Sequence, residues 1–135
     1  MGKTILIVED EPKNMTLTKD ILKISGYETI EAVDGRQGVE KAKSARPDLI
    51  LMDIMMPKMD GLEATRIIKA DNKTKHIPVI ALTSYAMKGD REKTIEAGCD
   101  GYIAKPLDIQ EVLKTIEHFL TAQEKVSSPD KLIDT

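Results

Sequence analysis

The feature that most constrains this sequence is a short apolar run that ends in a carboxylate. Residues 49–52 are Leu-Ile-Leu-Met, without polar alternation, and Asp53 follows directly. An uninterrupted run of this length is typical of a strand that is covered on both faces of a parallel sheet. In open α/β sheets, the carboxyl ends of the strands line the crevice where ligands bind. Asp53 is therefore the first candidate for chemistry.

Other short apolar segments predict further strands, and a helical pattern follows each of them. Predicted strands begin near residues 4, 27, 48, 78 and 100, which gives five βα units. Right-handed crossovers between such units produce a doubly wound α/β fold, with a five-stranded parallel sheet and five helices. Spacing alone does not determine the strand order. The flavodoxin-like order 2-1-3-4-5 is favoured for five strands.

The predicted helices differ in the clarity of their patterns. In the first helix, Pro12 suits the first turn, and Leu17, Ile21 and Ile24 predict an apolar face. The segment 88–97 is polar and has few apolar residues to attach it to the sheet. We therefore expect this helix to be the element that moves when the protein changes conformation.

The last helix has the clearest pattern and is expected from Asp108, its N-cap, to about Thr121. Its apolar stripe consists of Ile109, Val112, Leu113, Ile116 and Leu120. The segment that follows is polar and has no core face. We therefore expect one domain over residues 1–121 and a flexible tail over residues 122–135.

Composition excludes several classes of function. The formal net charge of -3 and a pI near 5.4 give no basic surface for nucleic acid. No apolar run approaches the length of a membrane span or forms a signal peptide. The lone Cys99 cannot form an internal disulfide, which fits a reducing compartment. The expectation is a cytoplasmic protein that binds neither nucleic acid nor membrane.

Acidic, hydroxyl and basic side chains stand at the ends of the predicted strands. Glu9 and Asp10 follow the first strand, Asp53 ends the third, and Thr83 and Lys105 follow the fourth and fifth. Carboxylates gathered in one crevice repel one another unless a cation joins them. Oxygen ligands without histidine or thiolate suit Mg²⁺. A carboxylate nucleophile, a metal, a lysine and a hydroxyl together are the parts required for phosphoryl transfer.

In this order, these residues resemble the receiver domain of two-component response regulators, over roughly residues 3–121. The resemblance rests on Glu9-Asp10 after ILIV, Asp53 in DLILMDIMMPKMDG, Thr83 in VIALTS, and Gly101-Tyr102 before Lys105-Pro106. It implies that Asp53 accepts a phosphoryl group from a phosphohistidine. The donor would be a sensor histidine kinase or a histidine phosphotransfer protein.

The resemblance also implies a metal site. Glu9, Asp10 and Asp53, with the backbone carbonyl of Met55, would hold Mg²⁺. Many family members carry two aspartates where this chain has Glu9-Asp10, and a Glu-Asp pair also occurs. A cation at this place is therefore expected in spite of the difference.

The remaining implied roles concern the phosphorylated state. Lys105 would pair with the phosphoryl group through a cis Lys105-Pro106 peptide, and Thr83 and Tyr102 would form the switch pair. The fourth helix, fifth strand and fifth helix would present the surface that binds a downstream protein. The chain resembles stand-alone, single-domain regulators: phosphoacceptors that assist their own phosphorylation and slow dephosphorylation, and not enzymes in the ordinary sense. A monomer or weak dimer is expected.

Simpler interpretations exist for single residues. Glu9 and Asp10 could be favourable charges at a helix N-terminus, and Tyr102 could be a half-buried aromatic without a switching role. Lys105 could be an ordinary surface charge. These interpretations do not explain why all the residues stand together at the strand ends.

Two alternative functions remain open. Phosphatases of the haloacid-dehalogenase type also use an aspartate, Mg²⁺, a threonine and a lysine, with a second aspartate two residues after the nucleophile. That position is Met55 here, and methionine cannot transfer protons. The other alternative is an interaction module that works without phosphorylation. Retention of the whole polar set argues against it.

Overall fold

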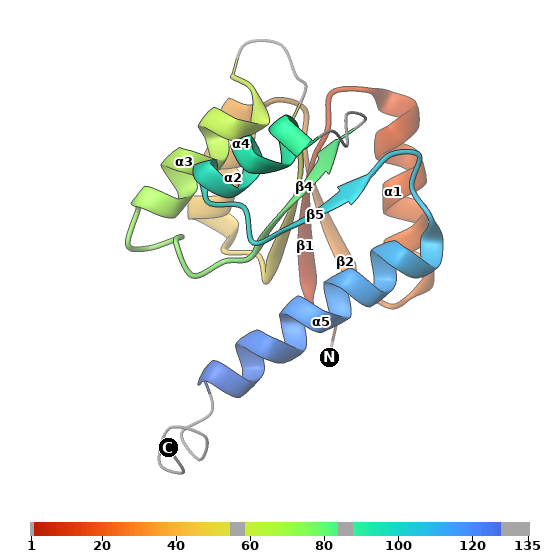
Figure 1. Cartoon of the computed structure of the whole chain (residues 1–135). Helices are drawn as coiled ribbons and strands as arrows, with labels where there is room; N and C mark the ends of the chain where they lie inside the picture. The colour runs from red at the N-terminus through yellow and green to blue at the C-terminus, as the bar shows by residue number, and fades with distance from the viewer. Residues whose placement is uncertain (1, 55–58, 84–87, 128–135) are drawn as a thin grey trace.

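The computed structural model describes residues 2–54, 59–83 and 88–127 and places a parallel sheet between two groups of helices (Figure 1). The strands are β1 (Thr4–Val8), β2 (Glu28–Ala32), β3 (Leu49–Asp53), β4 (Val79–Thr83) and β5 (Gly101–Ala104). The helices are α1 (Pro12–Ile24), α2 (Gly35–Ala45), α3 (Gly61–Ala70), α4 (Lys88–Ala97) and α5 (Ile109–Ser127).

The sheet has the order β2-β1-β3-β4-β5, and every pair is parallel. This confirms the predicted flavodoxin-like topology. In the register, Val8 is paired with Met52, and Asp53 is paired with Leu82. The carboxyl ends of β1, β3 and β4 therefore lie next to one another at one edge of the sheet, where the first, third and fourth crossovers begin.

The sheet separates two hydrophobic cores because successive strand residues point to opposite faces. Along β1, Ile5 and Ile7 face the core covered by α1 and α5, and Leu6 and Val8 face the core covered by α2 and α3. In Figure 1, α1 and α5 accordingly lie on one side of the strands, and α2, α3 and α4 lie on the other. Both faces of the central strands are buried, which explains their unbroken apolar sequences.

The predicted apolar face of α1 was wrong. Ile21 is buried, but Leu17 is 47% exposed and Ile24 is 87% exposed. The helix instead buries Met15 and Leu22, together with Thr18, whose hydroxyl donates to a backbone carbonyl of its own helix. Leu17 lies about half a turn from Met15, so one helix cannot present both residues to the core. Because Thr18 is polar but buried, a search for apolar residues alone does not find the buried face of the helix.

Helix α5 is longer than predicted. It begins as expected, with the Asp108 carboxylate accepting a hydrogen bond from a backbone N–H of the first turn. It continues to Ser127, six residues past the expected end near Thr121, because Ala, Gln, Glu and Lys in this segment favour a helix. Ile109 is 56% exposed, whereas the rest of the stripe is buried or packs on the core. No helix in the described part of the chain has the length and apolar character needed to cross a bilayer.

Candidate functional site

Three carboxylates meet at the carboxyl edge of the sheet. Glu9 and Asp10 directly follow β1, and Asp53 is the last residue of β3. One oxygen from each side chain lies within 4.8 Å of the others. Glu9 and Asp53 are buried, at 2% and 4% exposure, whereas Asp10 is exposed to solvent. The strand register thus brings together residues that are 44 positions apart in the sequence.

Lys105 reaches into this group from the residue that follows β5. Its ammonium nitrogen lies 3.0 Å from Glu9 Oε1 and 3.4 Å from Asp53 Oδ2. The side chain is 16% exposed. Its backbone N–H donates to the carbonyl of Thr83 at 2.7 Å, and the peptide to Pro106 is cis, as expected. The lysine is therefore held at the end of the sheet with its charge directed toward two carboxylates.

The charges at this site are unequal. Three carboxylates gather here, and the ammonium of Lys105 contacts two of them, those of Glu9 and Asp53. Burial, and next the neighbouring Asp53 carboxylate, raise the pKa of Glu9 to about 7, although Lys105 acts in the opposite direction. The raised pKa means that burial and the neighbouring carboxylate disfavour the ionised form of Glu9 more than Lys105 favours it. The donor atoms are all oxygens, and the group carries an excess of negative charge. Both properties fit a hard divalent cation such as Mg²⁺.

Thr83 and Tyr102 lie on one face of the sheet. Thr83 is the last residue of β4 and is 2% exposed, and Tyr102 on β5 is half-buried. Thr83 is paired with Ala104, and Ala81 is paired with Tyr102, so their side chains share a face. The intervening Leu82 belongs to the core covered by α1 and α5. Thr83 and Tyr102 therefore face the opposite side, where α4 lies (Figure 1).

Gly61 was not recognised from the sequence as part of the site. A Cβ atom at this position would lie 2.2 Å from the carbonyl oxygen of Asp53, a distance that no side chain tolerates. Gly61 also donates its N–H to the carbonyl of Ile54 at 3.0 Å. The Asp60-Gly61 pair predicts a turn, but only the structure reveals the close approach to Asp53. The predicted ligand Met55 falls outside the described residues.

Known proteins resemble the chain over most of its length. Residues 5–117 match the family model of the response regulator receiver domain. The polar-differentiation response regulator DivK of Brucella anthropi is 47% identical over 120 residues, which cover 89% of this chain and 98% of DivK.

Solved structures agree with this family match. The receiver domain of a Pseudomonas aeruginosa sensor histidine kinase is 40% identical, with a TM-score of 0.85, and the match covers 90% of this chain and 99% of that domain. That crystal structure has a magnesium ion coordinated in the active-site cleft. A CheY-like receiver domain protein of Methanospirillum hungatei is 34% identical, with a TM-score of 0.85 and coverage of 94% and 100%.

Proposed function

This chain belongs to the response regulator receiver domain family, and from that premise we propose that Asp53 is its phosphoryl acceptor. The position of Asp53 carries the proposal: it is buried at the end of β3, beside two further carboxylates and 3.4 Å from the ammonium of Lys105. A receiver domain is a signalling phosphoacceptor and not an enzyme in the ordinary sense. The donor would be a phosphohistidine of a sensor histidine kinase or a phosphotransfer protein.

Glu9, Asp10 and Asp53 would hold Mg²⁺, together with the backbone carbonyl of Met55. The oxygen cluster of this chain and the magnesium ion in the homologous kinase receiver domain both support this assignment. A bound Mg²⁺ would neutralise negative charge on the carboxylates and on the incoming phosphoryl oxygens. Asp10, which is exposed, would be the ligand nearest to solvent.

The side chains of this chain would then act in a simple sequence. A carboxylate oxygen of Asp53 attacks phosphorus, and the P–N bond to the donor imidazole breaks as the new O–P bond forms. The ammonium of Lys105 pairs with a phosphoryl oxygen, and the hydroxyl of Thr83 donates to another. The product is an aspartyl phosphate. Met55 supplies no general base, so the aspartyl phosphate would be hydrolysed slowly.

Phosphorylation would be sensed on the α4 side of the sheet. It adds negative charge and acceptor oxygens at Asp53, which would draw the Thr83 hydroxyl inward. Tyr102 lies on the same face and would move into the space that the threonine vacates. Coupling of this kind is typically about 1 to 3 kcal/mol, enough to shift two existing conformations. Thr83 and Tyr102 would therefore be the switch pair.

The surface formed by α4, β5 and α5 would bind a downstream protein. On the part of this surface formed by α4 and β5 lies a hollow of about 160 Å³, which is lined by Thr94, Ile95, Cys99, Asp100, Gly101 and Tyr102. Ile95, one of the lining residues, is 64% exposed. An apolar side chain of the partner would suit this hollow. We expect the protein to act as a monomer or weak dimer in the cytoplasm, with a receiver domain that ends near residue 121.

Incubation with acetyl phosphate and Mg²⁺, followed by intact-mass measurement, tests the proposal. Wild type should gain the mass of one phosphoryl group, and Asp53→Asn should gain none. Equal labelling of the variant would remove Asp53 from the mechanism. Sustained release of phosphate from a small phosphomonoester would favour the phosphatase alternative. Equal affinity of wild type and Asp53→Ala for a partner, with and without acetyl phosphate, would favour the phosphorylation-independent module.

A further inference from the structure

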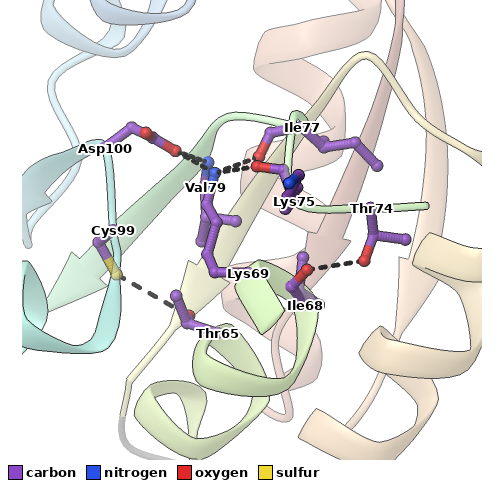
Figure 2. Close-up of polar contacts among 9 residues, drawn as sticks. All are labelled: Thr65, Ile68, Lys69, Thr74, Lys75, Ile77, Val79, Cys99 and Asp100. Carbon is purple, nitrogen blue, oxygen red and sulfur yellow. Dashed lines mark hydrogen bonds and ion pairs between the residues drawn. The ribbon is translucent and has the colours of Figure 1, made fainter. Parts of the chain in front are cut away.

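A second lysine, Lys69, is enclosed near Asp100 and Val79, at the amino end of β4 (Figure 2). Lys69 lies in the last turn of α3, and its side chain is 18% exposed. Its ammonium nitrogen lies 2.7 Å from Asp100 Oδ2 and donates to the carbonyls of Ile77 at 2.7 Å and Lys75 at 3.1 Å. An ammonium has three N–H donors, so each of them has an acceptor here.

Asp100 connects this lysine to the beginning of β4. Its Oδ2 accepts a hydrogen bond from the N–H of Val79 at 2.8 Å, and its own N–H donates to the carbonyl of Val79 at 2.8 Å. Val79 is the first residue of β4, and Thr83 is the last. The same strand thus has the Lys69–Asp100 pair at one end and the phosphoryl site at the other.

The carboxyl end of α4 packs on the same group. Gly98 follows α4 with φ of 104°, and a Cβ atom there would lie 3.0 Å from Lys69 Cγ. The next residue, Cys99, places its sulfur 3.8 Å from the hydroxyl of Thr65 on α3. We call Thr65, Lys69, Val79, Cys99 and Asp100 the Lys69 cluster. It joins α3, β4 and the turn after α4, as Figure 2 shows.

Helix α4 has few apolar residues with which to attach itself to the sheet. Among the residues of α4 whose side chains are described, 92–97, Thr94 and Ala97 are buried, and both are near the carboxyl end. Ile95, the large apolar residue of this segment, is 64% exposed. Anchoring at the carboxyl end therefore depends on the small buried side chains and on the polar Lys69 cluster.

We propose that the Lys69 cluster is the fixed pivot of α4. It would hold the carboxyl end of the helix to α3 and β4, so that a change at Thr83 tilts the helix about Gly98 and does not detach it. Lys69 and Asp100 are then positioning residues for the switch, and they do not take part in phosphoryl transfer. This inference rests on the proposed function, because it needs Asp53 to receive the phosphoryl group.

Loss of the pivot has a defined consequence. Without the ion pair, α4 would sample displaced positions even when Asp53 carries no phosphoryl group. The difference in α4 position between the unphosphorylated and the phosphorylated protein would therefore shrink. A modification shifts a conformational equilibrium only as far as it favours one conformation over the other. Chemistry at Asp53 would continue, because the Lys69 cluster lies at the other end of β4.

Hydrogen exchange of the α4 backbone amides, with and without beryllofluoride and Mg²⁺, tests the pivot in the full chain. Beryllofluoride serves as a mimic of the phosphoryl group on an aspartate. In wild type, α4 exchange should change when beryllofluoride is added. In Lys69→Met, α4 should exchange faster than in wild type without beryllofluoride. The change in α4 exchange on adding beryllofluoride should be smaller than in wild type by about threefold or more. Labelling of Asp53 by acetyl phosphate should stay within about twofold of wild type.

Two further variants complete the test, one as a control and one as a second change in the Lys69 cluster. Lys43→Met removes a lysine that lies 3.7 Å from Asp71 and is 49% exposed, and it should behave as wild type. Asp100→Asn preserves the shape of the side chain and should repeat the effect of Lys69→Met if that variant proves unfolded. If wild type is labelled while both cluster variants keep the full α4 response, the pivot is overturned alone. Absence of labelling in wild type would overturn the proposed function, and the pivot with it.

Discussion

Two lysines stand at opposite edges of the same sheet, and their surroundings differ in charge. Lys105, at the carboxyl edge, lies between the carboxylates of Glu9 and Asp53, with Asp10 close by. Lys69, at the amino edge, contacts the carboxylate of Asp100 and two neutral carbonyl oxygens. Both side chains are largely enclosed, at 16% and 18% exposure, so burial does not distinguish them.

The balance of charge distinguishes them. The lysine at the amino edge meets one negative charge and has an acceptor for each donor, which is an arrangement that stabilises the fold. At the carboxyl edge, three carboxylates lie beside one lysine, and burial together with the neighbouring Asp53 carboxylate raises the pKa of Glu9. Such an excess destabilises the cation-free protein and prepares it for a cation. In this molecule, the charge imbalance lies at the proposed site of phosphoryl transfer, and the balanced ion pair lies at the proposed pivot of α4.

Replacing each lysine by methionine should separate the two roles, and the larger effect concerns chemistry. Lys105→Met should slow phosphorylation of Asp53 by acetyl phosphate by about 100-fold, because a donor to the phosphoryl oxygens is lost. Lys69→Met should leave this rate within about twofold. The rate of mass increase at saturating Mg²⁺ measures both. Equal rates for the two variants would contradict the comparison.

Lys69→Met should instead reduce the free energy of unfolding. We expect a loss of about 1 to 2 kcal/mol, between the values of exposed and fully buried ion pairs, since Asp100 is 37% exposed. Urea denaturation followed by circular dichroism gives this value. The exposed Lys43→Met serves as the control and should change it less. A loss for Lys69→Met no greater than for Lys43→Met would show that the enclosed pair has no special stabilising role.

The pH dependence of stability should report the raised pKa of Glu9. The pKa of Glu9 is about 7 in the folded protein and 4.5 ordinarily, so the folded state holds this proton more tightly. Stability of the Mg²⁺-free protein should therefore fall as pH rises from about 4.5 to about 7. Melting temperatures across this range measure the effect. Glu9→Gln should remove this component, and Mg²⁺ should reduce it. An unchanged profile in Glu9→Gln would assign the dependence to other groups.

The smallest effect should come from the helix that connects the two edges. Helix α3 begins beside Asp53 and has Lys69 in its last turn, and the Asp60 carboxylate caps it by accepting the N–H of Glu63 at 2.8 Å. Asp60→Ala should cost about 1 kcal/mol of unfolding free energy. Asp60→Asn, which retains a capping oxygen, should cost less. Equal losses from both variants in urea denaturation would show that the cap oxygen is not the cause.

The sheet and the convergence of the site residues could be predicted because their sequence patterns are local or follow from the geometry of parallel strands. A strand that is buried on both faces shows an unbroken apolar run, as residues 49–52 do. Once parallel strands are recognised, their carboxyl ends must meet at one edge. Glu9, Asp53 and Lys105 therefore converge whatever the details of packing. The structure bears out this convergence to within hydrogen-bond distances.

Other features could not be predicted, for physical reasons. The inner face of α1 includes Thr18, which satisfies its hydroxyl within the helix and so escapes a search for apolar periodicity. The contacts of Lys69 are mostly with backbone carbonyls, whose positions have no signature in the sequence. The need for glycine at position 61 depends on the distance to the Asp53 carbonyl, which only the folded chain defines.

Chemical trapping of the phosphorylated residue is the most direct test of Asp53 as the phosphoryl acceptor. Borohydride reduces an aspartyl phosphate to homoserine, so treatment of the acetyl phosphate-labelled protein followed by peptide sequencing identifies the acceptor. Homoserine is expected at position 53, formed when Mg²⁺ is present and greatly reduced when it is chelated. Homoserine at position 10, or a stable label on another residue while residue 53 remains aspartate, would contradict this assignment of the acceptor.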